Sequence, residues 1–470
     1  MKDIQFKVGF ARVDITPPLG VPVVGYFEER VAKGVLDNLE VNAVAFDDSE
    51  RRAVLITADL LGIEGAAFNA ALRRRIARAA GFDEAAVYIH CTHTHTGPGA
   101  GKADKGRTDL FDGTEFFNEF LAARLADAAR LAIVDLSPAT LAVGCAQARR
   151  ISFLRRYRMK DGSIRTNPGV GNPEIDSPLG MLDETVRVLK IAREGKDDIA
   201  LVNFATHPDT IGGELISGDW PAMARRTFEL AEPGNRCVVL NGPQGDVNHI
   251  CTDPLPGENE GLFPQFDGVA RGYDHARHMG RVVASAALSV WGKCAPVAAG
   301  KLRYAVTMLS VPSQMPSPSE LSSARRIVRL HRAGRDSELP FKDMELTTAV
   351  AEAGRMLLLE HGPKSFKLPL SALAIGDSII FAGIPGEPFS EIGFAVRSQS
   401  PFANVFCTCL TNSSQGYFPV ASAYAEGGYE ARSSIFGPSV ADDIVTGLLN
   451  LMRILLGTAP KSLSQNERVR

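Results

Sequence analysis

Residues 86–99 read Ala86-Val87-Tyr88-Ile89-His90-Cys91-Thr92-His93-Thr94-His95-Thr96-Gly97-Pro98-Gly99. The apolar start predicts a strand, and the glycines and proline predict that it stops there, with both imidazoles at its end. On an extended backbone, histidines at i and i+2 point to the same side. Sites in open α/β sheets form at strand ends, and neutral imidazole is a common zinc ligand. The pattern indicates either a metal site or two histidines hydrogen-bonded in a loop.

The segments around this stretch alternate between strand-like and helix-like patterns. This alternation, with several hairpin-like turns, is typical of an α/β fold with mixed β-sheets flanked by helices. We expect a single large domain over residues 1–457 and a polar, frayed tail over 458–470. The apolar spacing predicts strands over 8–15, 41–46, 53–58, 199–206, 237–241 and 378–384, and helices over 66–80, 115–134, 319–332 and 341–361.

Composition places the chain among soluble globular proteins. Its 470 residues are 45% hydrophobic and 22% charged, with a formal net charge of −3. This charge gives no electrostatic footprint for nucleic acid, and no basic run suggests stable membrane association. The N-terminus, residues 1–7, lacks the apolar region of a signal peptide, and no stretch approaches the roughly 18 apolar residues of a membrane span.

Cysteine usage indicates a reducing compartment. The chain has seven cysteines, an odd number with no framework spacing. We interpret them as reduced thiols and expect a cytoplasmic protein. Cys91, next to the histidine pair, is either a soft metal ligand or a small buried apolar residue.

Other strand-like runs also end in polar residues beside glycine or proline. Separately placed His, His and Glu are the usual composition of a catalytic zinc site with an open position. The polar ends are His207-Pro208, Gly245-Asp246-Val247-Asn248-His249, Pro385-Gly386-Glu387-Pro388, and the stretch from Gly416-Tyr417 to Tyr429-Glu430.

In order along the chain, these motifs resemble those of the neutral/alkaline (non-lysosomal) ceramidase family. The resemblance runs from about Gly9 to Pro438 and implies the family's catalytic domain, an αββα-type layered sandwich. The chain resembles a short bacterial-type member of this family that lacks the C-terminal immunoglobulin-like domain. The matching motifs are 92–99 (Thr-His-Thr-His-Thr-Gly-Pro-Gly), 204–208 (Phe-Ala-Thr-His-Pro), 217–219 (Ser-Gly-Asp), 245–247 (Gly-Asp-Val), 385–388 (Pro-Gly-Glu-Pro), 416–430 (Gly-Tyr-x11-Tyr-Glu, the tyrosines being Tyr417 and Tyr429) and 436–438 (Phe-Gly-Pro).

The resemblance implies one Zn²⁺ per chain. Its ligands would be His93, His207, Glu387 and Tyr417, of which tyrosine is an unusual zinc ligand. His95 and Tyr429 would stand beside the metal as proton donors or oxyanion stabilisers. For both tyrosines, packing in the core or at its rim is the alternative.

The sequence departs from the family in two respects. Ceramidases have serine in Gly-Asp-Val-Ser-Pro-Asn, where this chain has Asn248 followed by His249. No acyl-serine can form there, and we expect Asn248 to orient substrate. The family's immunoglobulin-like domain and usual secretion signal are not apparent either, and membrane ceramide is therefore not the expected substrate.

The sequence leaves two alternative roles for several further polar residues. In ceramidases an arginine-containing segment borders the site, so Arg155 and Arg156 are candidate substrate-binding residues, with a solvated basic face as the alternative. His249 is a third candidate for the pocket. Acidic residues that end apolar runs orient the histidines or serve as turn and cap residues. They are Asp14, Asp59 and Asp219.

The sequence thus predicts a zinc-dependent hydrolase in which metal-activated water cleaves an amide bond in a small soluble substrate. Esterase, lactonase or sugar-derivative hydrolase activity on the same site is the alternative. A ligand-binding protein that keeps the scaffold without turnover is the alternative of another class. The only partner expected is the small-molecule substrate, and the sequence leaves the oligomeric state open.

Overall fold

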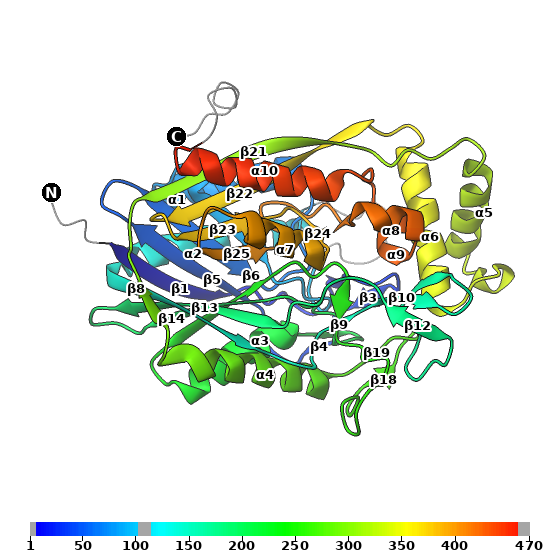
Figure 1. Ribbon diagram of the computed structural model, residues 1–470, viewed down its shortest axis with the longest axis horizontal. Helices are drawn as coiled ribbons and strands as arrows, with labels where there is room; N and C mark the ends of the chain where they lie inside the picture. Colours follow the sequence, from blue (N-terminus) through cyan, green and yellow to red (C-terminus); the bar gives the residue numbers. More distant parts are fainter. Residues whose placement is uncertain (1–5, 102–113, 459–470) are drawn as a thin grey trace.

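The computed structural model describes residues 6–101 and 114–458 and is built on two stacked β-sheets (Figure 1). The larger sheet has nine strands in the order β16-β14-β13-β8-β1-β5-β6-β7, with β20 paired to β8. Most neighbours are antiparallel, whereas β6–β7 and β14–β16 are parallel. The strands are β1 (Lys7–Asp14), β5 (Glu40–Asp47), β6 (Arg52–Ala58), β7 (Val87–Cys91), β8 (Ser137–Gln147), β13 (Thr185–Arg193), β14 (Ile199–Phe204), β16 (Arg236–Asn241) and β20 (Ala295–Val297).

The smaller sheet covers one face of the larger. It has the order β21-β22-β23-β25 and is mixed, because β23 and β25 are parallel. Alternate residues of both sheets, such as Phe46 and Phe381, share one buried cluster between them, as expected when side chains alternate across a strand. The strands are β21 (Leu302–Pro312), β22 (Ser365–Ile375), β23 (Ile379–Gly383) and β25 (Asn404–Thr408).

Helices cover the two outer faces, and the layers are therefore helix, sheet, sheet, helix. Apolar residues of α1 and α2 pack on one half of the large sheet, and those of α3 and α4 on the other half. Residues of α7 and α10 pack on the small sheet. The helices are α1 (Ala66–Ala80), α2 (Thr114–Val134), α3 (Asp219–Ala231), α4 (Tyr273–Trp291), α7 (Ser390–Gln399) and α10 (Val440–Leu455). This arrangement confirms the predicted α/β class and the layered sandwich.

The large sheet is strongly curved, and this curvature brings its two edges together. Asn241, at the end of edge strand β16, donates its backbone N–H to Nε2 of His90 on the other edge strand, β7, at 3.2 Å. Asn241 also accepts a hydrogen bond from the N–H of Cys409, just after β25. The ends of β7, β16 and β25 therefore meet in one place, although they belong to different parts of the sheets.

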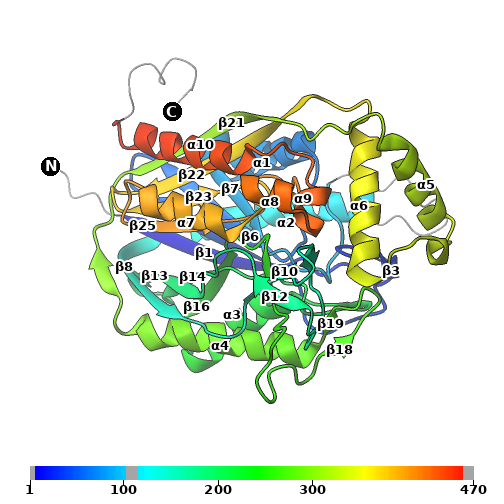
Figure 2. The ribbon, with the colours of Figure 1, turned by 45° about the vertical axis from the view of Figure 1, so that its right-hand side comes forward.

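Helices α5 (Leu321–Arg332) and α6 (Asp343–Leu359) pack on each other beyond the ends of the sheets (Figures 1 and 2). In both views α6 stands beside the short helix α9 (Tyr429–Ser433) and near strand β10 (Arg156–Met159). No helix in the described part of the chain is long and apolar enough to cross a bilayer.

The predicted elements are confirmed to within a few residues. Residues 66–80 are α1 as predicted, and the predicted strand over 199–206 ends at Phe204. Residues 137–147 and 302–312 form long strands that their composition does not single out, since Pro, Ser, Gly and charged residues interrupt them. The strand at 137–147 pairs with neighbours on both sides, and the strand at 302–312 pairs over its whole length with β22, and this pairing stabilises both strands. The predicted tail lies outside the described residues from 459 onward.

Candidate metal centre

His93 and His95 converge because the chain turns after β7. His93 has a φ of 77°, a left-handed conformation that is rare outside glycine, and its N–H donates to the Leu60 carbonyl. The expectation of an extended backbone at this point is therefore wrong. The two imidazoles nevertheless meet, with their Nε2 atoms 3.3 Å apart.

His207 and Glu387 come to the same point from other strand ends. His207 follows β14, and its Nε2 lies 3.2 Å from Nε2 of His93. Oε2 of Glu387 lies 3.2 Å from Nε2 of His93 and 3.7 Å from Nε2 of His207. All four side chains are buried, with relative exposures of 8% or less.

The hydrogen bonds of the outer ring nitrogens leave lone pairs facing this point. Nδ1 of His93 lies 2.6 Å from the Leu61 carbonyl oxygen, and Nδ1 of His207 lies 3.4 Å from that of Gln244. A carbonyl can only accept, so each Nδ1 carries a proton, and the neutral form of each ring leaves its Nε2 bare. Lone pairs facing one another at this separation repel unless a cation lies between them. The ligand atoms of His93, His95 and His207 lie within 4.8 Å of one another and could hold a metal ion.

Burial keeps these groups in the ionisation states that bind a cation. Desolvation lowers the pKa values of His95 and His207 well below the ordinary value, so both imidazoles are neutral. Burial alone would raise the pKa of Glu387, but His93 and Arg155 hold that pKa below its usual value. The centre thus combines a carboxylate with three imidazoles, of which burial keeps His95 and His207 neutral.

Both predicted tyrosines lie beside Glu387. Tyr417 is directly opposite Glu387 where the two-residue strands β24 (Glu387–Pro388) and β26 (Tyr417–Phe418) pair in parallel. The Tyr417 and Tyr429 rings are 5.5 Å apart in an edge-to-face arrangement. Burial raises the pKa values of both phenols, so each hydroxyl is protonated in the absence of a cation.

Arg155 also reaches the centre, whereas Arg156 points elsewhere. The Arg155 guanidinium carbon lies 5.4 Å from the Tyr417 ring centroid, and Nε lies 2.7 Å from Oε1 of the buried Glu430. Arg156 Nη2 instead contacts Glu426 and the Gly427 carbonyl, each at 3.0 Å. Arg155 therefore orients the tyrosine side of the centre.

The polar contacts of Asn248 and His249 go to the protein itself. Nδ2 of Asn248 donates to Oδ1 of Asn167 at 3.1 Å, and its Oδ1 accepts from the N–H of Ile250. His249 lies between the Asp209 carboxylate, 3.2 Å from Nδ1, and the Ala270 carbonyl, 2.8 Å from Nε2. Both side chains are fully buried and contribute to the walls of the site.

A tyrosine that sequence reasoning missed packs against His95. The Tyr26 ring centroid is 4.9 Å from that of His95, and the ring lies between the guanidinium carbons of Arg30 and Arg271, at 4.2 and 4.3 Å. A Cβ on Gly25 would fall 2.8 Å from the His95 ring, so only glycine fits there. No local pattern around residue 26 signals this role, because the contact depends on folding.

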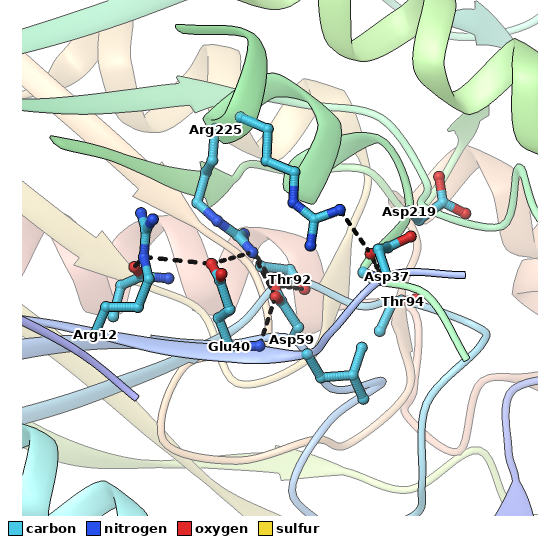
Figure 3. A network of polar contacts seen from close by, with 12 residues as sticks. Arg12, Asp37, Glu40, Asp59, Thr92, Thr94, Asp219 and Arg225 are labelled. Carbon is cyan, nitrogen blue, oxygen red and sulfur yellow. Dashed lines mark hydrogen bonds and ion pairs between the residues drawn. The ribbon is translucent and has the colours of Figure 1, made fainter. Parts of the chain in front are cut away.

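A buried ionic network lies beneath the histidine loop (Figure 3). Asp59 accepts a hydrogen bond from the Thr92 hydroxyl and two from Arg225, at 3.0 and 2.5 Å. Arg225 also contacts Glu40, which lies 3.3 Å from Arg12. Asp59 thus supports the residue next to His93, the orienting role that was one of its two predicted alternatives.

The other two predicted acids act in turns, and Cys91 is a buried thiol. Asp14 accepts from the N–H of Thr16 in an exposed turn. Asp219 begins α3 and accepts from the N–H of Ile211. Burial raises the pKa of Cys91 to about 12, which favours the apolar role over that of a thiolate ligand.

Comparison with known proteins agrees with this geometry. The family model of the N-terminal part of neutral/alkaline non-lysosomal ceramidases matches residues 6–303. The chain is 25% identical to a neutral ceramidase of Mycobacterium tuberculosis, covering 92% of this chain and 74% of that protein. The structure of neutral ceramidase from Pseudomonas aeruginosa superposes with a TM-score of 0.72 at 18% identity, covering all of this chain and 78% of that one. A ceramidase complexed with C2 gives 0.70 at 18% identity, covering 99% and 79%. The chain therefore belongs to the neutral/alkaline non-lysosomal ceramidase family and is a hydrolase of the amide-bond-cleaving kind.

Proposed function

We propose that this protein is a zinc-dependent hydrolase that cleaves an amide bond in a small soluble substrate with metal-activated water. The observation that supports it best is the convergence of the Nε2 atoms of three histidines and the Glu387 carboxylate on one buried point. Nitrogen and carboxylate ligands in this combination suit zinc. The seven free thiols support the proposed cytoplasmic location, since such thiols persist in a reducing compartment.

The proposed ligands are His93, His207, Glu387 and Tyr417. A zinc ion held there would supply a water of lowered pKa and polarise the substrate carbonyl. His95 presents its Nε2 to the same point, so it either completes the ligand set or passes a proton to the leaving nitrogen. The neutral state imposed by burial suits a ligand, and in the second role His95 would first accept a proton from the attacking water and then give that proton to the leaving nitrogen.

The remaining side chains bind and orient rather than attack. The protonated Tyr429 hydroxyl, beside Tyr417, can donate to the oxygen on which charge develops. Arg155 holds Tyr417 from the opposite side. Asn248 has no hydroxyl that could attack the substrate, and its amide donates to Asn167. These two facts favour direct attack by water over a covalent step.

Metal content of the purified wild type and of His207→Ala, measured by elemental analysis, tests the proposal. The matched control is His361→Ala, because the His361 side chain is 90% exposed and far from the centre. We expect about one zinc per chain and chelator-sensitive hydrolysis of p-nitroacetanilide in the wild type and the control, and neither in His207→Ala. Full metal content and turnover in a folded His207→Ala protein would contradict the proposal. Hydrolysis of a chromogenic ester but of no amide would favour the esterase alternative, and no turnover at all would favour a ligand-binding protein.

A further inference from the structure

A cavity of about 580 Å³, lined by both charged and apolar residues, adjoins the candidate metal centre. Its walls come from residues 161–169, which include strand β11 (Ile164–Thr166), from residues 267–268, from the start of α6 and from the start of α9. Figure 2 shows α6 and α9 side by side at this end of the molecule. We call this cavity the α6 pocket. Its volume lies in the range of small-molecule sites.

We propose that the α6 pocket binds a hydroxylated or zwitterionic part of the amide substrate, so that the natural substrate is a short hydrophilic amide rather than one with a long alkyl chain. This inference rests on the proposed function and names the class of substrate for it.

The α6 pocket and the metal centre share a wall. Tyr429 lines the pocket, and its ring packs against Tyr417, which is paired with Glu387. Thr166 lines the pocket as well, and its hydroxyl donates to Glu430 at 3.0 Å, the same carboxylate that contacts Arg155. Tyr429 and the Thr166–Glu430–Arg155 contacts therefore connect this pocket to the metal centre.

Asn167 links the pocket to the position where this chain departs from its family. It lines the pocket and accepts the hydrogen bond from Asn248. A serine at position 248 has a shorter side chain with a single hydroxyl and does not reproduce this amide–amide contact. The replacement thus supports a pocket wall instead of supplying a nucleophile.

Charged side chains of both signs line the pocket. Two of them, Arg165 and Glu345, contact each other across it at 3.3 Å. In the described ranges, no ion pair or side-chain hydrogen bond engages Lys342 or Asp343. These two groups leave a donor and an acceptor available to a ligand. The charged lining residues are Asp161, Arg165, Asp267, Lys342, Asp343, Glu345 and Arg432.

This lining disfavours a long alkyl chain. An alkyl chain stabilises a complex by leaving water for an apolar wall, and here it would instead cover charged groups without satisfying them. Hydroxyl, ammonium or carboxylate groups of a ligand can hydrogen-bond to those same residues. The apolar members, including Ile164, Phe341 and Met344, lie among these charged groups and suit the carbon face of a sugar or a short side chain.

Met344→Trp, which fills the pocket from the first turn of α6, tests the inference without touching the proposed catalytic residues. The matched control is Met308→Trp, because Met308 is 53% exposed on β21 and lies outside the pocket. The substrates are N-acetylglucosamine, N-acetylglutamine, N-octanoyl-butylamine and p-nitroacetanilide, each assayed with and without chelator.

We expect the wild type to prefer the hydroxylated or zwitterionic amides over the octanoyl amide. We expect Met344→Trp to lower kcat/KM for the preferred amide by roughly tenfold or more, with p-nitroacetanilide hydrolysis nearly unchanged. A wild-type preference for the octanoyl amide, or an equal effect of Met344→Trp on all amides, would overturn the pocket assignment while leaving the hydrolase proposal intact. If no amide is hydrolysed, the proposed function fails, and calorimetry then decides the pocket: N-acetylglucosamine or N-acetylglutamine must bind the wild type and not Met344→Trp.

Discussion

Replacing Arg225 with methionine tests the ionic network beneath the histidine loop. The Arg225 guanidinium donates two hydrogen bonds to Asp59 and one to Glu40, at 3.0, 2.5 and 3.2 Å. Both Arg225 and Asp59 have side chains that are 1% exposed. Methionine retains most of the length of the side chain but removes every one of these donors.

The expected loss is large because Asp59 would remain buried without its cation. Breaking a buried pair by removing one partner costs about 3–5 kcal/mol of unfolding free energy. The neighbouring Arg226 is the matched control, since it is 37% exposed and its Nη1 is 3.9 Å from Asp37. Asp37 is buried but also accepts hydrogen bonds from the Ser217 hydroxyl and the Gly218 N–H, which Arg226→Met leaves in place. The long contact to the exposed Arg226 contributes about 0–1 kcal/mol, so Arg226→Met should cost far less.

Urea unfolding followed by tryptophan fluorescence measures both variants. The chain has two tryptophans, and both Trp220 on α3 and Trp291 on α4 are buried in the cluster around the helix that carries Arg225. A fall in the unfolding midpoint without a change in slope reports a change in stability. Because Asp59 also binds the Thr92 hydroxyl next to His93, the variant should retain metal more weakly, by about 10–100-fold in affinity.

A loss for Arg225→Met within about 1 kcal/mol of that for Arg226→Met would refute this reasoning. A second check is the double variant Asp59→Asn/Arg225→Met. Because it removes both charges, it should recover more than half of the stability lost in Arg225→Met. No recovery would mean that the network stabilises the fold through packing and not through charge.

Two further predictions concern single residues near the centre. Gly25→Ala should weaken metal retention by about 10–100-fold, measured by metal titration, because the added Cβ would lie 2.8 Å from the His95 ring. The control is Gly20→Ala, because Gly20 has a φ of 89° and no atom lies within 4 Å of an added Cβ, so this variant should show only backbone strain. An equal loss of metal retention in both variants would exclude the proposed clash. Burial raises the pKa of Asp219 to about 6 from 3.8, so its stabilising contribution is present below pH 4 and is lost as pH rises through 6, by about 3 kcal/mol. Asp219→Asn should therefore gain about that much relative to wild type between pH 4 and pH 7.5 in urea unfolding, and a pH-independent difference would contradict the shift.

Helices and strands with a regular apolar period were predictable from sequence. Helix α1 matches the predicted range of 66–80, and the apolar run at 199–206 is the buried strand β14. In these segments the spacing of apolar residues along the sequence matches the spacing of the buried positions. The strand at 302–312 was not apparent, because its exposed positions interrupt that pattern and pairing with β22 compensates for them.

The types of residue that form the centre were also predictable from the sequence. The resemblance to the ceramidase family, carried by motifs that follow strand-like runs, implies His93, His207, Glu387 and Tyr417 as ligands, and the structure brings them together around one point. The reason is that strands place their ends at shared edges, so a motif after each strand is a local signal of a common site.

The precise partners of each polar atom were decided by folding. The positive φ of His93, the contact of Tyr26 with His95 and the α6 pocket each depend on segments far apart in the chain. Arg155 and Arg156 are neighbours of the same type, yet one faces Tyr417 and the other faces Glu426. Residue type and local period thus account for the elements, the family and the kinds of ligand. Which atoms face one another follows from the burial and pairing of the whole chain, because side-chain direction depends on a backbone path that only tertiary packing fixes.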